Sequence, residues 1–173
     1  MTRIYTRSGD QGESGLVNGQ RLTKADLLFD VLGDVDELNA QLGMIRALSA
    51  DSKVDQQLSR IQHQLFDLGA QVAQYKENNM KAADIKQLED WIDDWQDQLT
   101  PLKQFILPAG NQAGSSAHLS RSICRRAERK AWQAAAGHDI EAEVMQYLNR
   151  LSDYLFVLAR VLNGGQEVFW QSE

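Results

Sequence analysis

The sequence predicts an all-α protein, most simply an antiparallel bundle of about five helices. Apolar residues recur at spacings of three and four along most of the chain, which is typical of amphipathic helices. No stretch of useful length alternates apolar and polar residues, and the connections between the periodic segments are short. The 173 residues suffice for one domain with a substantial hydrophobic core.

The first part of the chain predicts a loop followed by two helices. Residues 7–15 are rich in Gly, Ser and Asp, a composition typical of loops. A helical pattern follows from about Lys24 to Leu48, residues 50–52 predict a turn with a new N-cap, and a second helix is expected from about Lys53 to Tyr75. The apolar stripes of these helices are Leu28, Val31, Leu32, Val35, Leu38, Leu42 and Ile45, then Val54, Leu58, Ile61, Leu65, Leu68 and Val72.

Three more helices are expected in the rest of the chain. Residues 77–79 break the second helix, and Pro101 begins a connector that ends near Gly114. Ser115 or Ser116 is expected to cap the fourth helix, which runs to about Ala136. The last helix is expected from about Asp139 to a stop at residues 163–165. The inward residues of the third and last helices are Ile85, Leu88, Trp91, Ile92, Trp95 and Leu99, then Ile140, Val144, Tyr147, Leu148, Leu151, Leu155, Leu158 and Leu162.

Composition excludes several classes of protein. The net charge of −6 and the pI of 5.1 argue against a general nucleic-acid binder. No apolar run is long enough to span a bilayer, and the first residues lack the apolar core of a signal peptide. The single cysteine, Cys124, cannot form an internal disulfide; a buried inert thiol is expected, with a low-pKa thiol as the alternative. These features predict a cytoplasmic protein.

Residues 121–130 carry five cations and one carboxylate, a local charge of +4 in an acidic chain. The segment has no Gly or Pro, so it should be helical. One face would then hold Arg121, Arg125, Glu128, Arg129 and Trp132. Like charges so close repel, and an oxyanion such as a polyphosphate would offset the repulsion, because guanidinium groups bind phosphate bidentately. A solvated helix face, with Glu128 as internal counter-ion, is the equal alternative.

The N-terminal loop has glycines at positions 9, 12 and 15. The spacing matches neither a Walker A loop nor a Rossmann fingerprint. Its composition suits a nest of backbone N–H groups around an anion, with hydroxyls and cations nearby and Asp10 available to a Mg²⁺ ion. The side chains that would assist are Thr6, Ser8, Ser14, Arg7 and Lys24. A flexible loop without a ligand is the alternative.

Polar residues on two other helices are further candidates. The carboxylates of Asp34, Asp36 and Glu37 lie either on the surface or against Arg121 or Arg125 of the fourth helix. In the last helix, Asn149 and Asp153 share a face and serve either as structural contacts or as ligand contacts. The three histidines show no ligand spacing, so no metal site built by protein side chains is expected.

Six segments of the chain run in the order of one known family's motifs. They are residues 4–12, 33–39, 61–69, 105–108, 121–129 and 147–153, and the most specific are Arg-Arg-Ala-Glu-Arg at 125–129 and Asn-Arg-Leu-Ser-Asp at 149–153. On these segments the chain resembles the PduO-type corrinoid adenosyltransferases, which are ATP:cob(I)alamin adenosyltransferases.

The resemblance implies a cobalamin adenosyltransferase-like five-helix bundle. It implies one domain over residues 1–173, in which residues 1–23 form a loop that wraps ATP. It also implies a homotrimer with active sites between neighbouring subunits, where Asp36 would pair with Arg121 across the interface. The residues implied to bind the nucleotide are Thr6, Arg7, Ser8, Gly9, Ser14, Gly15, Lys24, Arg121, Arg125, Arg126, Glu128, Arg129 and Asn149.

The implied reaction is adenosyl transfer from ATP to the cobalt of cob(I)alamin. Co(I) attacks the 5′ carbon of the ribose and triphosphate leaves, so the nucleophile belongs to the corrinoid and not to the protein. Three residues are implied to be catalytic. Arg125 would neutralise the departing triphosphate together with Mg²⁺, Asn149 would fix the ribose or metal-bound phosphates, and Phe105 would occupy the place of cobalamin's lower axial ligand.

The chain departs from the family pattern at Gln11, Glu13 and Ala109. Glu13 brings a carboxylate near the expected polyphosphate. The departures at Gln11 and Glu13 keep a non-catalytic carrier or chaperone of ATP or corrinoid as the alternative. An RNA-binding module built on the arginine helix is a weaker alternative, because the chain is acidic overall. The expected partners are a reductase and a cobalamin-dependent enzyme, with no nucleic acid and no membrane.

Overall fold

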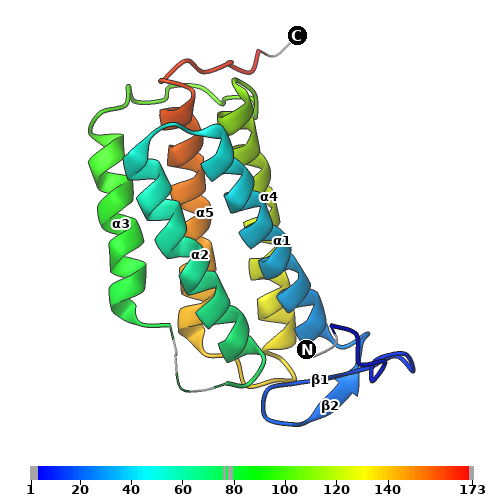
Figure 1. The fold of residues 1–173 in the computed structure, drawn as a ribbon. Coiled ribbons are helices and arrows are strands. Elements are labelled where there is room, and N and C mark those ends of the chain that lie inside the picture. Colours follow the sequence, from blue (N-terminus) through cyan, green and yellow to red (C-terminus); the bar gives the residue numbers. More distant parts are fainter. Residues whose placement is uncertain (1–3, 76, 78–79, 172–173) are drawn as a thin grey trace.

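The computed structural model describes residues 4–75, 77 and 80–171, and these form the predicted bundle of five helices (Figure 1). The helices are α1 (Leu27–Leu48), α2 (Ser52–Val72), α3 (Ala82–Gln96), α4 (Gln112–Ala134) and α5 (Ala142–Leu162). α4 packs against both α1 and α5, while α2 packs against α1 and α3 against α5. The all-α class is therefore confirmed. The break predicted at residues 77–79 lies partly outside the described residues.

Capping side chains, which the apolar pattern does not reveal, set the starts of α1, α2 and α4. α1 begins three residues later than predicted, because Asp26 accepts a 2.9 Å hydrogen bond from the N–H of Leu28. The predicted caps of α4 were wrong: Asn111 caps the helix by accepting from the N–H of Gly114 at 2.8 Å. α5 begins at Ala142 instead of near Asp139. The predicted stop at residues 163–165 is confirmed.

α4 packs into the bundle through a face of small side chains. Six buried residues of this face follow one another at alternating spacings of three and four; they are Ala117, Ser120, Cys124, Ala127, Ala131 and Ala134. Small side chains let the neighbouring helices approach closely. The long cationic side chains are thereby left on the other sides of α4.

Three glutamines of α2, spaced seven residues apart, carry hydrogen bonds across the core. Gln57 accepts from the hydroxyl of Tyr154 at 3.1 Å, and Gln64 accepts from the hydroxyl of Tyr147 at 2.9 Å. Gln71 donates to Glu141 at 2.7 Å, just before α5 begins. All three glutamines are buried, so these bonds satisfy polar groups that would otherwise be costly in the core.

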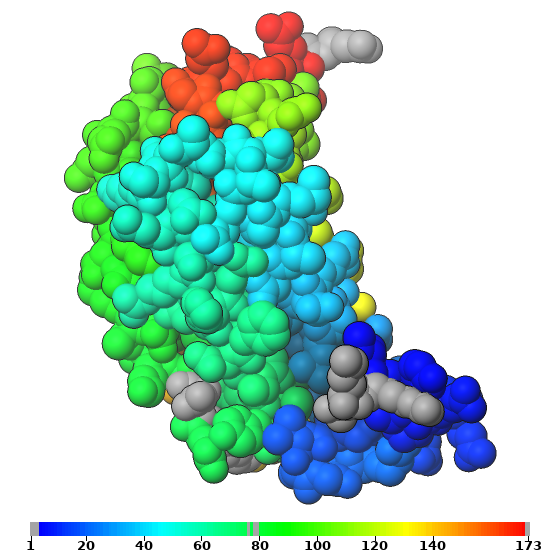
Figure 2. Space-filling view, viewed as in Figure 1, coloured from blue at the N-terminus to red at the C-terminus, as the bar shows by residue number. Residues whose placement is uncertain are grey.

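The N-terminal loop contains a short hairpin that the sequence did not predict. β1 (Glu13–Gly15) pairs antiparallel with β2 (Arg21–Thr23), with Ser14 opposite Leu22. Leu16 is buried, and the N–H of Val17 donates to the carbonyl of Ala73 at 3.2 Å, which ties the loop to the end of α2. Figure 2 shows the loop projecting beyond the side of the helices.

The opposite end of the bundle carries the connector between α3 and α4 together with the C-terminal segment (Figure 1). The two segments form an antiparallel bridge between Ile106 and Phe169. The N-terminal loop and the C-terminal segment therefore lie at opposite ends of the bundle. Within the described residues, no helix combines the length and the apolar character that crossing a membrane requires.

Candidate functional site

The outward face of α4 carries exposed arginines. Arg125 and Arg129 are both exposed, and Arg129 donates a 3.1 Å hydrogen bond to the backbone carbonyl of Arg125. Within the described part of the chain, neither guanidinium forms an ion pair with a carboxylate. Trp132, one turn further along, is also exposed. The predicted common face of α4 is confirmed, and its cations at Arg125 and Arg129 are available to an anionic ligand.

The other two cations of α4 face α1. Arg126 donates to Asp34 at 3.1 Å and also contacts the carboxylate of Glu37. Lys130 pairs with Asp34 and with Asp30, each at 3.3 Å. The hydrogen bond to Asp34 raises the pKa of Arg126. The expectation that helix carboxylates face Arg121 or Arg125 was wrong within one chain, because Asp34 and Glu37 face Arg126 instead.

Asn149 of α5 lies beside this outward face. Its amide donates a 3.0 Å hydrogen bond to the carboxylate of Glu128, which joins α5 to α4. Asp153, one turn along α5, pairs with Arg150 at 3.2 Å. The hydrogen bond with Asn149 holds the Glu128 carboxylate toward α5. The motifs at 125–129 and 149–153 thus meet, as expected if they form one site.

Phe105 and Arg121 line one cavity of about 690 Å³ at the connector end of the bundle. Phe105 is 82% exposed, whereas Arg121 is half-buried with its guanidinium 5.8 Å from the ring centre of Phe156. The Nε of Arg121 is buried and has no hydrogen-bond partner among the described residues. His118 also contacts Phe156 and has a lowered pKa, because burial and then the charge of Arg121 disfavour its protonation.

The N-terminal loop gathers the remaining predicted residues. The hydroxyls of Thr6 and Ser8 are hydrogen-bonded at 2.8 Å. Lys24 reaches back to Gly9 so closely that a Cβ added at Gly9 would lie 3.1 Å from the Nζ of Lys24. Ser14 and Gly15 belong to β1. The loop therefore brings its predicted hydroxyls and its lysine onto one short stretch of chain.

Arg21 organises this loop, although it is not among the residues that the sequence predicts for the site. Its guanidinium forms a 3.3 Å ion pair with Glu13 and donates to the carbonyl of Ser8 at 2.8 Å. The carboxylate of Glu13, which departs from the family pattern, is thus paired within the hairpin. The Asn18-Gly19 dipeptide is typical of tight turns between strands, so it could have indicated the hairpin that brings Arg21 to Glu13.

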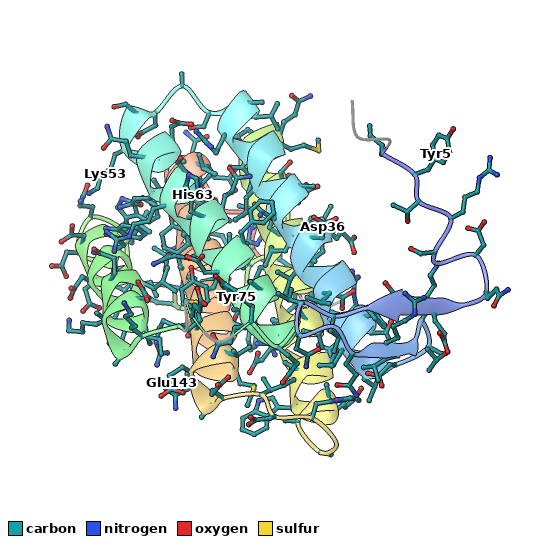
Figure 3. The ribbon with its side chains drawn as sticks, turned by 60° about the horizontal axis from the view of Figure 1, so that its bottom comes forward. Tyr5, Asp36, Lys53, His63, Tyr75 and Glu143 are labelled. Atoms are coloured by element: carbon teal, nitrogen blue, oxygen red, sulfur yellow. The ribbon has the colours of Figure 1, made fainter. Side chains whose placement is uncertain are left out.

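Within one chain, the described part of the loop makes no polar contact with the arginines of the outward face of α4. Among the described residues, no hydrogen bond or ion pair joins residues 4–24 to Arg125, Arg129 or Asn149. Figure 3 shows Tyr5 held away from the helices. Asp36 is exposed on α1 and also lacks an ion-pair partner within the described part. No three His, Cys, Asp or Glu residues of that part come together as metal ligands.

Comparison with known proteins places this helical bundle among the transferases. A family model described as cobalamin adenosyltransferase matches residues 4–162, and the chain belongs to this family. A cobalamin adenosyltransferase of Cupriavidus metallidurans is 43% identical over 100% of this chain and 96% of its own length. The corrinoid adenosyltransferase MMAB of Homo sapiens is 39% identical over 96% of this chain and 72% of its own length.

Solved structures show the same fold. A variant PduO-type ATP:corrinoid adenosyltransferase from Lactobacillus reuteri, complexed with cobalamin and ATP, superposes with a TM-score of 0.91. It is 32% identical, and the match covers 98% of this chain and 100% of that protein. A second variant, complexed with ATP, superposes with a TM-score of 0.90 at 34% identity over 97% of this chain and 100% of that protein.

Proposed function

We propose that this chain transfers the 5′-deoxyadenosyl group of ATP to the cobalt of a reduced corrinoid, giving adenosylcobalamin and triphosphate. One observation carries the proposal. α4 lines the cavity of Phe105 with Arg121, and about one turn and two turns further along the same face it presents the exposed Arg125 and Arg129. A single helix therefore joins a cavity that Phe105 and Phe156 help to line to a cationic surface, an arrangement suited to transfer between a corrinoid and a nucleoside triphosphate.

The transfer needs positioning and charge more than it needs a protein nucleophile. The electron pair of Co(I) forms the bond to the 5′ carbon, the bond from that carbon to its phosphate oxygen breaks, and triphosphate leaves with the electron pair. Arg125, Arg129 and Lys24 would offset the charge on the leaving group, with Mg²⁺ held on the phosphate oxygens. Asn149 would orient the ribose or the metal-bound phosphates.

The remaining predicted residues have supporting roles in this proposal. Arg126 is already paired with Asp34 and Glu37, so its part is to anchor α4 on α1. Glu128 keeps Asn149 in place. Phe105 would close the lower side of the corrinoid against water and against an axial ligand. The nucleotide would also contact the loop through Thr6, Arg7, Ser8, Gly9, Ser14 and Gly15.

The active site is proposed to form between copies of the chain in a cytoplasmic homotrimer. The loop of one copy would approach the outward face of α4 of another, which accounts for their separation within one chain. Asp36 is exposed without an ion-pair partner among the described residues, and Arg121 has an unpaired buried Nε, so a pair between copies would serve both. Charge reversal at both positions together, Asp36→Arg with Arg121→Asp, should restore an assembly that either reversal alone weakens.

The direct test combines the protein with chemically reduced cobalamin, ATP and Mg²⁺. Adenosyl transfer changes the optical spectrum of the corrinoid and releases one triphosphate for each cobalt alkylated. A carrier or chaperone would bind ATP or corrinoid without releasing triphosphate. Binding with no triphosphate release would therefore replace the proposed function by the carrier alternative.

Mixed assemblies test whether the site is shared between copies. Lys24→Ala removes a loop cation and Arg125→Ala removes a cation of α4, so each variant alone should be impaired. In a co-expressed mixture, about a quarter of the interfaces would join an intact loop to an intact α4 and recover activity. Mixtures no more active than the separate variants would show that each chain builds its own site.

A further inference from the structure

Arg160, in the last turn of α5, forms a buried ion pair with the C-terminal segment. Its Nε donates to Glu167 at 2.7 Å, and both side chains are only 7% exposed. The chain returns to Arg160 through Gly164 and Gly165, which have φ values of 64° and 71° in the left-handed region that favours glycine. The pair therefore fixes the direction that the chain takes after α5.

The same guanidinium also holds the beginning of the connector between α3 and α4. Its Nη2 donates to the carbonyl of Thr100 at 2.6 Å. One side chain thus joins α5, the connector and the C-terminal segment. Since a buried charge is costly without full hydrogen bonding, this arrangement has strict geometric requirements.

The residues after Glu167 pair with the part of the connector that carries Phe105. The N–H of Leu107 donates to the carbonyl of Val168 at 2.7 Å, and the N–H of Trp170 donates to the carbonyl of Phe105 at 2.9 Å. The Phe105 side chain is 82% exposed, so its own packing contributes little to its position. Its backbone is held by the C-terminal segment, which is held in turn by Arg160.

We propose that Arg160 and Glu167 are positioning residues that set the place of Phe105 at its cavity and thereby the affinity for the corrinoid. This inference rests on the proposed function, in which Phe105 faces the corrinoid. The proposed nucleotide contacts lie on α4, at Asn149 of α5 and in the N-terminal loop, and Arg160 is hydrogen-bonded to none of them among the described residues. Loss of the pair should therefore affect the corrinoid and spare ATP.

The test compares Glu167→Gln with the control Asp55→Asn. Gln keeps a hydrogen-bond acceptor and removes the charge, so the variant should still fold. Asp55 pairs with the Nε of Arg46, also at 2.7 Å, but that pair joins α1 to α2 and touches neither the connector nor the C-terminal segment. Thermal unfolding checks that both variants are folded, and amide hydrogen exchange at Leu107 and Trp170 reports directly on the pairing.

In Glu167→Gln we expect faster exchange at both amides and a rise of about tenfold in the KM for cob(I)alamin, with the KM for ATP within about twofold of the unmodified protein. A Phe105→Ala variant, which removes the ring itself, serves as the reference for a displaced Phe105. The optical spectrum of cob(II)alamin bound together with ATP should change in the same direction in Glu167→Gln as in that variant. Asp55→Asn should change none of these. Glu167→Asp, which keeps the charge, should restore much of the corrinoid affinity.

Two results would overturn the inference. One is unchanged exchange at Leu107 and Trp170 in Glu167→Gln, because the ion pair would then not hold the connector. The other is an equal rise in the KM for ATP and for cob(I)alamin, which would indicate a general loss of structure. If the unmodified protein transfers no adenosyl group, the proposed function fails, and exchange with equilibrium binding of cob(II)alamin decides the positioning role by itself.

Discussion

Arg126 of α4 donates a 3.1 Å hydrogen bond to Asp34 of α1, whose side chain is only 9% exposed. The same carboxylate accepts a bond from Lys130 at 3.3 Å. One nearly buried carboxylate thus pairs with two cations of α4. The cations of the basic segment therefore fall into two groups. Arg126 and Lys130 bind the helix to its neighbour, while Arg125 and Arg129 remain available outside.

Asp34→Asn should destabilise the protein, because Arg126 and Lys130 would lose their shared charged acceptor. We expect a loss of about 1–3 kcal/mol in the free energy of unfolding, measured by denaturant titration. Asp94→Asn is the control, since Asp94 is 65% exposed and pairs with Lys53 only at 3.8 Å. The control should change stability by less than about 0.5 kcal/mol. Equal effects of the two substitutions would contradict the role of Asp34.

Arg125→Ala should lower turnover by about 10²–10³-fold, the usual cost of removing one preorganised donor to developing charge. The side chain is exposed, so thermal stability should hardly change. Single-turnover rates with saturating ATP and cob(I)alamin provide the measurement. Arg125→Lys should retain part of the rate, because it keeps the charge without the planar guanidinium. A folded Arg125→Ala protein with near-normal turnover would remove this residue from the mechanism.

Gly114→Ala should destabilise the start of α4. A Cβ at this position would lie 2.1 Å from the Oδ1 of Asn163, a side chain held by Ala109 at 2.9 Å and by Asn111 at 3.0 Å. We expect a loss of about 1–3 kcal/mol in the free energy of unfolding. Gly43→Ala is the control, because its nearest neighbour would be 3.6 Å away and alanine favours a helix interior. The control should be neutral or more stable.

Cys124 should not react with thiol reagents in the folded protein. Its side chain is fully buried and donates a 3.1 Å hydrogen bond to the carbonyl of Leu148, and burial raises the pKa of the thiol. A disulfide reagent at about pH 8 should label the protein only after denaturant is added. Rapid labelling under native conditions would show that the buried face of α4 readily becomes accessible to solvent in the folded protein.

Stability should fall as the pH drops below the ordinary pKa of histidine, partly because of His118. Burial, and then the charge of Arg121, lower the pKa of His118 from its ordinary 6.5. Below that pH the unfolded chain binds a proton that the folded chain binds less readily, so acid favours unfolding. Between about pH 7 and 5 the free energy of unfolding should fall less steeply in His118→Gln. Identical slopes for both proteins would contradict the lowered pKa.

The bundle could be predicted from sequence because its determinants are local. The spacing of Leu28, Val31 and Val35 already describes a buried helical face, and the structure buries all three. The starts of α1 and α4 depend instead on single capping side chains, Asp26 and Asn111. The hairpin escaped prediction because each strand has only three residues, too few to show alternation.

The site could be predicted only in part. The face with Arg125 and Arg129 follows from helical periodicity, but the pairing of Arg126 with Asp34 joins residues 92 positions apart. The contact of Phe105 with the C-terminal segment is likewise tertiary and runs through backbone atoms. Almost any residue type can form a hydrogen bond between backbone atoms, so the sequence does not reveal such a contact. The sequence therefore points to Phe105 but not to the C-terminal segment that holds it.

The alanine-lined packing of α4 has a consequence for tolerance to sequence change. Ala127 and Ala131 touch no proposed ligand, yet a larger side chain at either position would displace the whole helix from its neighbours. Every guanidinium on its far side would then move together. In a mutational scan, larger residues at these interior positions should lower activity as substitutions in the active site do. The distance of a residue from the reacting atoms will therefore be a poor guide to how strongly its substitution lowers activity.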